Sequence, residues 1–432
     1  MNTSISTLEI PLNEVKPFIL ANVKLQCERP QTARMSIIGS PGCGKSDILR
    51  QVCEENGWGL AVKYLSNMSM EQITGIPCRV EAGSGAQWTK PELFNFDNLD
   101  YKPEGYEPGK SVTILLIDDF HLADKIIQKY LFQLLTYKSL NGYRLPENTA
   151  IIMAGNKITD KALAHSIPAP VMNRISVYEV KADKDDWIKN FAFKHGVRHD
   201  ILTFLEQHPA YLVQTPIEST PWASPRSWTF LSEQMDAYEK LYRSIPIEKL
   251  NLIASGLIGK EYTAEFITYR EIFSKWDWRS LRAMPDKELF KKIKSDIEDN
   301  AINAYGLINS GFAWMLDVWS KNNYNCNDKE VKETTDFVYK VQSTILTMKC
   351  KNVQVKPMVI AGLDYLYKFQ DSLSNFKFSE QLSNCRKAFL KNIMRQAPSD
   401  WLFYEIIANV FSIDLTDDDK ENIKKAKAEF HV

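Results

Sequence analysis

Residues 39–46 read Gly-Ser-Pro-Gly-Cys-Gly-Lys-Ser, which fits the pattern GxxxxGK[ST] of a phosphate-binding P-loop. The apolar run 35–38 leads into this segment as a buried strand would, and residues 46–50 follow it as a helix would. The motif requires this order, because inward-pointing N–H groups of the loop and the positive end of a helix together attract phosphate. The segment therefore predicts an α/β fold that binds a nucleotide.

Two side chains of the loop have predicted roles. Lys45 can reach the β- and γ-phosphates, and the Ser46 hydroxyl can ligate Mg²⁺. Cys43 is unusual: a thiol near a helix N-terminus has a lowered pKa, although a small residue filling a permissive position is the simpler interpretation. The residues predicted to bind ATP with Mg²⁺ are Gly39, Ser40, Pro41, Gly42, Cys43, Gly44, Lys45, Ser46 and Asp47.

A second apolar run, residues 112–117, ends in Asp118 and Asp119. A continuous apolar run suits a central strand of a parallel sheet, and ligands bind at the carboxyl ends of such strands. Asp118 is predicted to hold Mg²⁺ through water, and Asp119 to orient or deprotonate the attacking water. An ordinary strand followed by a solvated turn is the alternative, which the upstream P-loop disfavours.

Composition narrows the function further. The chain has 432 residues, enough for two or three domains, and its net charge of −1 gives no global positive field that would attract nucleic acid or membrane. No apolar run approaches the roughly 18 residues of a membrane span, and residues 1–5 lack a secretory signal. Seven cysteines without a CxxC pair favour a reducing compartment, so we expect a cytoplasmic protein.

Short apolar strands alternate with helices from residue 35 to about 180, and only helical periodicity follows. This pattern predicts a three-layer αβα core with a parallel sheet. A helix within residues 18–27 is expected to cover the nucleotide base, and the insert 79–110 to form an ordered loop or hairpin near the nucleotide. The predicted strands are 35–38, 60–64, 112–117, 150–154 and 177–180.

Two later residues are further candidates. Asn156 follows the apolar strand, where its amide could hold the lytic water by donating and accepting at once, although an Asn after a strand is usually a turn residue. Arg174 ends a short helix that begins at residue 169. Its guanidinium could reach the γ-phosphate on a neighbouring subunit, although spacing alone favours a surface ion pair.

In their order along the chain, these segments resemble the AAA+ ATPases, and within them the MoxR-like ATPases of bacteria and their phages. The resemblance covers roughly residues 30 to 270, and nothing recognisable follows. It is carried by residues 74–77, by the strand with Asp118 and Asp119, and by residues 140–146, 154–160, 167–174, 187 and 224–228.

The resemblance implies roles for three residues. Asn156 would be the sensor 1 residue, Arg174 an arginine finger acting on the neighbouring subunit, and Arg226 the sensor 2 residue of a helical lid, contacting its own subunit's ATP. Residues 139–146 would form the hairpin before sensor 1, and residues 68–77 would lie near the axial face of a ring. The implied domains are 1–182 (nucleotide-binding), 183–270 (helical lid) and 271–432 (helical C-terminal extension).

The resemblance also implies partners. Such ATPases form rings, usually hexamers, that remodel a protein client, and they are often paired with a protein carrying a von Willebrand factor A domain. The chain departs from the family at position 119, where MoxR-like ATPases usually have Glu, and this difference bears on the rate of ATP hydrolysis. Asp119 recedes by about 1 Å, and a misplacement of that size can cost on the order of a hundredfold in rate. Slow ATP hydrolysis is therefore expected.

Two other functions stay open beside the remodelling ATPase. A nucleic-acid-directed AAA+ ATPase, such as a loader, an initiator or a restriction motor, should show a basic face interleaved with aromatic residues. The basic segments 287–294 and 349–356 are interrupted by acids or lie on amphipathic helices, which favours a solvated surface. A nucleotide-binding scaffold with little hydrolysis is the third function, and Asp119 is its main support.

Overall fold

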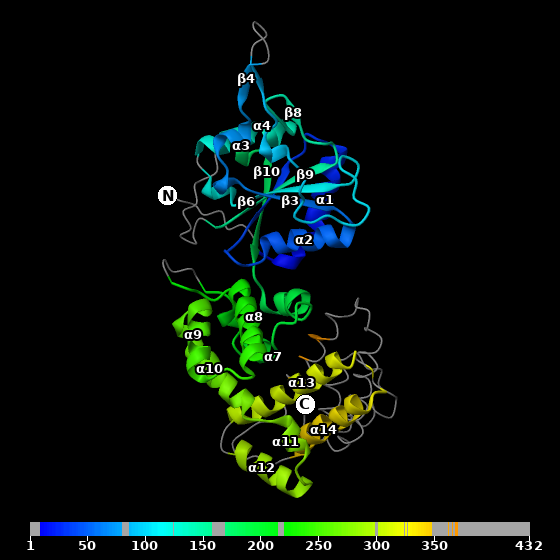
Figure 1. The fold of residues 1–432 in the computed structure, drawn as a ribbon, viewed down its shortest axis with the longest axis vertical. Coiled ribbons are helices and arrows are strands. Elements are labelled where there is room, and N and C mark those ends of the chain that lie inside the picture. Colours follow the sequence, from blue (N-terminus) through cyan, green and yellow to red (C-terminus); the bar gives the residue numbers. More distant parts are fainter. Residues whose placement is uncertain are drawn as a thin grey trace, which may run out of the picture. The chain divides into compact units, whose positions relative to one another are not determined.

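A computed structural model describes residues 9–79, 86–123, 125–157, 169–214, 220–298, 301–323, 325, 327–347, 362, 365, 368 and 369. These residues belong to two compact units (Figure 1). The first unit comprises Met1–Trp187, Ala210–Phe230 and Leu257–Gly259, and the second comprises Ile188–Pro209, Leu231–Gly256 and Lys260–Val432. Within the described residues, no helix has both the length and the apolar character needed to cross a membrane.

The first unit contains a six-stranded sheet in the order β1-β10-β2-β9-β6-β3, and every pair of neighbouring strands in it is parallel. Strands β6 and β9 are buried along their whole length, which explains their continuous apolar sequences. All five predicted strands are confirmed. The strands are β1 (Ile10–Pro11), β2 (Arg34–Ile38), β3 (Gly59–Tyr64), β6 (Thr113–Asp118), β9 (Thr149–Gly155) and β10 (Ile175–Lys181).

Helices cover both faces of this sheet, so the predicted three-layer αβα core is confirmed. On one face, α1 (Lys16–Glu28) and α2 (Lys45–Asn56) bury apolar side chains against β2, β9 and β6. On the other face, α3 (Met70–Thr74) and α4 (Lys125–Tyr137) pack on β3, β6 and β9. The 3₁₀ turns Leu12–Val15, Leu65–Asn67, Glu92–Phe94 and Phe120–Leu122 and the short helices α5 (Ala169–Met172) and α6 (Lys184–Trp187) connect these elements.

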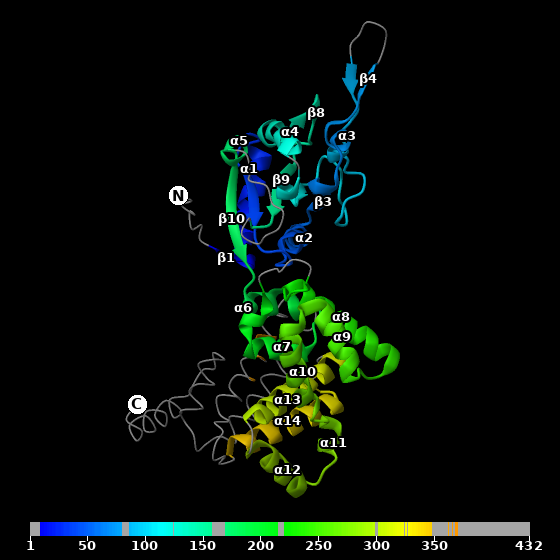
Figure 2. The ribbon, with the colours of Figure 1, turned by 90° about the vertical axis from the view of Figure 1, so that its left-hand side faces the viewer.

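Two small hairpins extend from the α3 and α4 side of the first unit (Figure 2). The first, β4 (Pro77–Arg79) with β5 (Ala86–Trp88), begins the insert for which a loop or hairpin was expected. The second, β7 (Ser139–Leu140) with β8 (Tyr143–Arg144), is the hairpin that the family resemblance implied. The two hairpins contact each other, because the Tyr143 hydroxyl donates to the carbonyl oxygen of Trp88 at 2.8 Å.

After β10, all described elements are helical, as predicted. In the second unit, α13 packs between α10 and α14 and buries the large side chains Phe312 and Trp319. The domain boundaries at residues 182 and 270 stay a prediction, and the basic segment 349–356 lies outside the described residues. The elements are the π-helix Ile188–Ala192, α7 (His199–Gln207), the 3₁₀ turn Pro209–Leu212, α8 (Pro225–Tyr242), α9 (Ile247–Ile258), α10 (Lys260–Ser274), α11 (Trp278–Arg282), α12 (Asp286–Glu298), α13 (Ala301–Lys321) and α14 (Lys329–Thr347).

Candidate nucleotide-binding site

The chain between β2 and α2 forms a tight loop that ends at the helix N-terminus. Gly42 and Gly44 have φ angles of 77° and 101°, a region that residues with a Cβ rarely adopt. Lys45 begins α2 and is 7% exposed. Its ammonium group donates to the carbonyl oxygens of Gly39 at 2.8 Å and Ser40 at 3.0 Å, so the positive charge is held over the loop.

The predicted sensor residue lies beside this lysine. Lys45 Nζ donates to Asn156 Oδ1 at 3.1 Å, although the two residues are 111 positions apart. Asn156 directly follows β9, the strand that lies next to β2 in the sheet. The structure therefore brings together the P-loop lysine and the polar residue at the neighbouring strand end.

The two predicted Mg²⁺ ligands also lie together. Ser46 Oγ donates to Asp118 Oδ2 at 2.6 Å, and the other Asp118 oxygen accepts from the backbone N–H of Asp119 at 2.9 Å. A P-loop magnesium site needs few protein ligands, because phosphate oxygens and water complete the octahedron. One hydroxyl and one carboxylate therefore fit Mg²⁺ bound with a nucleoside triphosphate. No cluster of three or more His, Cys, Asp or Glu that could form an all-protein metal site occurs among the described residues.

Asp119 adopts a left-handed conformation, with φ 50°, where the chain leaves β6. Partial burial and the neighbouring Asp118 charge raise the pKa of its carboxyl group, while the positive charges of Lys45 and Arg226 partly oppose this rise. A carboxyl group with a raised pKa is a better proton acceptor, which suits the predicted role beside the attacking water.

Arg226 lies at the start of α8, next to the P-loop. Its backbone N–H donates to the carbonyl oxygen of Gly42 at 3.3 Å, and its side chain is exposed. The helix start is capped, since Ser224 Oγ accepts from the N–H of Ser227 at 3.2 Å, and Pro225 occupies the first helical position, where proline is favoured. The predicted sensor 2 residue therefore lies next to the P-loop of its own chain.

Arg174 does not lie beside the P-loop of its own chain. The parallel pairing of Ile175 with Arg34 puts it at the edge of the sheet where β2 begins, whereas the P-loop follows the other end of β2. Its guanidinium lies 4.1 Å from the Phe132 ring centroid and donates through Nε to Thr136 Oγ1 at 2.9 Å. The structure thus does not bring Arg174 to the P-loop of its own chain.

The lowered pKa considered for Cys43 is wrong. The thiol is 4% exposed and packs in the core cluster between the sheet and α2. Burial raises the pKa of the Cys43 thiol, and the nearby Lys45 only partly opposes this rise. Cys43 is therefore a protonated packing residue, in line with the simpler interpretation.

The sequence analysis missed His121, which is 1% exposed in the turn Phe120–Leu122 directly after the two acids. Burial, and to a lesser extent the charge of Lys45, lowers its pKa to about 4, so the imidazole is neutral at physiological pH. No sequence pattern marks this residue, because its position depends on which strands lie side by side.

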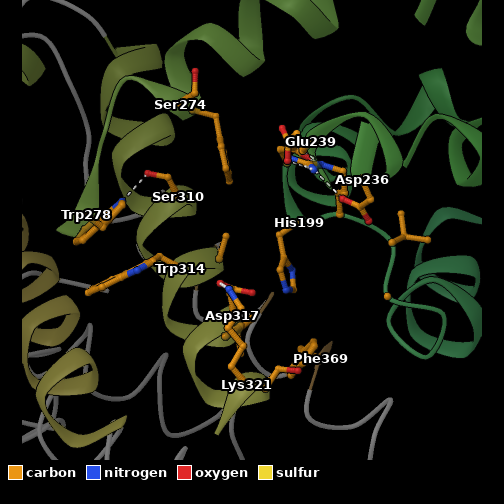
Figure 3. Close-up of a pocket in the computed structure, with 18 of the residues that line it drawn as sticks. His199, Asp236, Glu239, Ser274, Trp278, Ser310, Trp314, Asp317, Lys321 and Phe369 are labelled. Carbon is orange, nitrogen blue, oxygen red and sulfur yellow. Dashed lines mark hydrogen bonds and ion pairs between the residues drawn. The ribbon is translucent and has the colours of Figure 1, made fainter. Parts of the chain in front are cut away.

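The second unit contains a cavity of about 1320 Å³ with charged and aromatic walls (Figure 3). Trp278 and Trp314 stack there with ring centroids 5.9 Å apart. On another wall, Arg198 donates to Asp236 at 2.7 Å and to Glu239 at 2.8 Å. Arg198 directly precedes α7, and Asp236 and Glu239 lie on α8, so these ion pairs join the two helices.

No protein-family model and no curated protein matches the chain. A solved point mutant of Thermotoga maritima RuvB is 12% identical, covers 61% of this chain and 75% of its own, and superposes with a TM-score of 0.34. A Cytophaga hutchinsonii protein described as a candidate ATPase is 11% identical, with 61% and 88% covered and a TM-score of 0.27.

Proposed function

We propose that the protein is an AAA+ ATPase of the MoxR type, which binds and hydrolyses ATP with Mg²⁺. The hydrogen bond between Ser46 and Asp118 supports this proposal, because a hydroxyl and a buried carboxylate this close together could both bind one Mg²⁺. When bound, Mg²⁺ would neutralise negative charge on the transferred phosphoryl group.

Each neighbouring side chain has a place in this chemistry. Lys45 binds the β- and γ-phosphates, exchanging the carbonyl oxygens of the loop for phosphate oxygens. Asp119 orients the attacking water and accepts its proton, and Asn156 holds the same water through its amide. Arg226 contacts the nucleotide of its own subunit from α8.

The proposal includes assembly into a ring, a hexamer by resemblance, in which Arg174 acts on the neighbouring subunit. Its distance from its own P-loop, along the length of β2, supports a role in trans. So does an apolar stripe on the outer side of α4, where Ile126, Tyr130 and Tyr137 are 60%, 38% and 56% exposed. Exposed apolar surfaces of this kind favour association. The client is proposed to be a protein, with a von Willebrand factor A domain protein as the candidate partner.

Two measurements on the purified chain test the proposal. Phosphate release with ATP and Mg²⁺ should be slow but clear, and it should be lost with EDTA and in Lys45→Ala. ATP binding without any phosphate release would instead support the nucleotide-binding scaffold. Absence of ATP binding in a folded chain would remove the P-loop assignment altogether.

A further inference from the structure

His121 lies in the turn Phe120–Leu122, which follows β6 at the carboxyl end of the strand. The N–H of Leu122 donates to the carbonyl oxygen of Asp119 at 2.9 Å, which closes the turn. On its far side, Gln128 Nε2 donates to the carbonyl oxygen of Ala123 at 3.1 Å. The turn is therefore fixed at both ends, and the imidazole between them has little freedom to move.

The imidazole lies directly against Gly155, the last residue of β9. A methyl group built on Gly155 would lie 1.8 Å from Nδ1 and 2.3 Å from Cε1 of His121, far inside contact distance. Gly155 does not adopt a positive φ angle. Glycine is therefore required here by the space that the imidazole occupies and not by backbone conformation.

Gly155 is linked to two parts of the candidate nucleotide-binding site, the P-loop and Asn156. Its carbonyl oxygen accepts from the N–H of Gly39, the first residue of the P-loop, at 3.2 Å. The next residue is Asn156, which accepts from Lys45. A shift of this single backbone segment would therefore move both the P-loop entrance and the predicted sensor.

The Nδ1 atom of His121 is buried and has no hydrogen-bond partner among the described residues. An unsatisfied buried polar atom costs about 1–3 kcal/mol, a cost that an apolar side chain of similar size would avoid. What the imidazole does contact is Gly155, the residue directly before Asn156, so any role of His121 at the site acts through this contact.

We infer that His121 is a positioning residue for ATP hydrolysis, which holds Gly155 and thereby keeps Asn156 in register with Asp118 and Asp119. The inference rests on the proposed ATPase function and adds a residue that acts through the backbone of β9. In this role, the contact between His121 and Gly155 couples the position of the turn Phe120–Leu122 to the position of β9.

A double-mutant cycle on the full-length protein tests this role. Gly155→Ala and His121→Ala should each lower kcat by about tenfold or more, because small displacements of catalytic groups are costly. KM should change by less than about threefold, since the P-loop lysine and glycines remain. The combined variant should exceed both single variants in kcat, because the new methyl group occupies space that the ring has left. Gly256→Ala, in α9 with no atom within 4 Å of the added methyl group, is the matched control and should behave as wild type.

The outcomes separate this role from the proposed function. No hydrolysis by the wild-type chain overturns the ATPase proposal, and this inference falls with it. An active wild type together with an unchanged kcat in His121→Ala, or a combined variant that does not exceed both single variants in kcat, overturns only the role of His121. Melting temperatures identify variants that do not fold. His121→Asn, which keeps a planar polar group against Gly155, then decides: it should retain kcat within about threefold, and a tenfold fall in folded protein overturns the inference.

Discussion

Ser46 and Asp118 are 72 positions apart in the sequence, yet their side chains share a hydrogen bond of 2.6 Å. Ser46 follows β2 and Asp118 ends β6, and β9 lies between these two strands. The bond therefore spans the end of β9, where Asn156 contacts Lys45. Three adjacent strands thus deliver the loop, the acids and the sensor to one edge of the sheet, where parallel sheets bind ligands.

Lys45→Ala should lose most of the ATP affinity while the fold survives. Among the oxygen atoms of the described residues, the ammonium group bonds the loop carbonyls of Gly39 and Ser40 and the Asn156 amide, so its removal leaves no carboxylate there without a partner. A fall in affinity of about tenfold or more is expected from the loss of a charge-assisted contact to phosphate. Isothermal titration measures it, and unchanged affinity in a folded variant would contradict the assignment of the P-loop.

Asp119→Asn should bind ATP nearly as the wild type does and hydrolyse it at least about a hundredfold more slowly, because the amide cannot accept the proton. The matched variant Asp119→Glu introduces the longer side chain that MoxR-like ATPases usually have at this position. It should hydrolyse ATP faster than the wild type if the length of the side chain limits the rate. A single-turnover assay measures both, and wild-type turnover in Asp119→Asn would show that another group is the base.

Asp200 in α7 should be the main electrostatic determinant of stability in the second unit. It is 4% exposed and accepts from Arg198 Nη2 and from Arg270 Nε, each at 3.1 Å. Asp200→Asn should destabilise the protein by about 3 kcal/mol, because the guanidinium groups of Arg198 and Arg270, 19% and 16% exposed, lose their most buried charge partner and keep Asp236 or Glu239. Thermal unfolding measures the effect. The control Asp236→Asn, whose side chain is 43% exposed, should cost less than about 1 kcal/mol.

The Asp200 carboxylate should also make the stability of the protein depend on pH. Burial alone would raise the pKa of Asp200, but Arg198 and Arg270 outweigh it and hold the pKa below its usual value. A lowered folded-state pKa stabilises the protein above the unfolded value of about 3.9, and this contribution disappears as the pH falls through the folded-state pKa. The difference in melting temperature between wild type and Asp200→Asn should therefore narrow on acidification. A constant difference down to pH 3 would exclude this linkage.

Apolar runs predicted five of the six strands of the sheet, and only β1 (Ile10–Pro11), which is two residues long, has no such run. The runs of β2, β6 and β9 lead directly into the P-loop, the two acids and Asn156. Asp118 and Asn156 could be recognised in this way. His121 and its contact with Gly155 could not, since that contact depends on the lateral order of β6 and β9. The pKa of Cys43 was misjudged for a related reason: position at a helix N-terminus is visible in the sequence, whereas burial in the core is not.

Arg174→Ala should bind ATP nearly normally and hydrolyse it poorly, since an arginine finger supplies charge only to the transition state of the neighbouring subunit. Its guanidinium packs on Phe132, so the control Arg279→Ala, an exposed arginine of α11, separates this role from a general loss of positive charge. The control should hydrolyse ATP at the wild-type rate. A folded Arg174→Ala with full activity would remove Arg174 from the mechanism.

Mixing two weak variants tests whether Arg174 acts in trans. A site with Arg174→Ala still holds Lys45, and a Lys45→Ala neighbour still carries Arg174, so mixed assemblies contain complete composite sites. Mass photometry with a size-tagged partner should first show that subunits exchange. The mixture should then hydrolyse ATP faster than the sum of the separate rates, and the rate should peak at intermediate ratios because complete sites need one subunit of each kind. If subunits exchange and the rate stays at that sum, the finger is another residue, or each subunit completes its site alone.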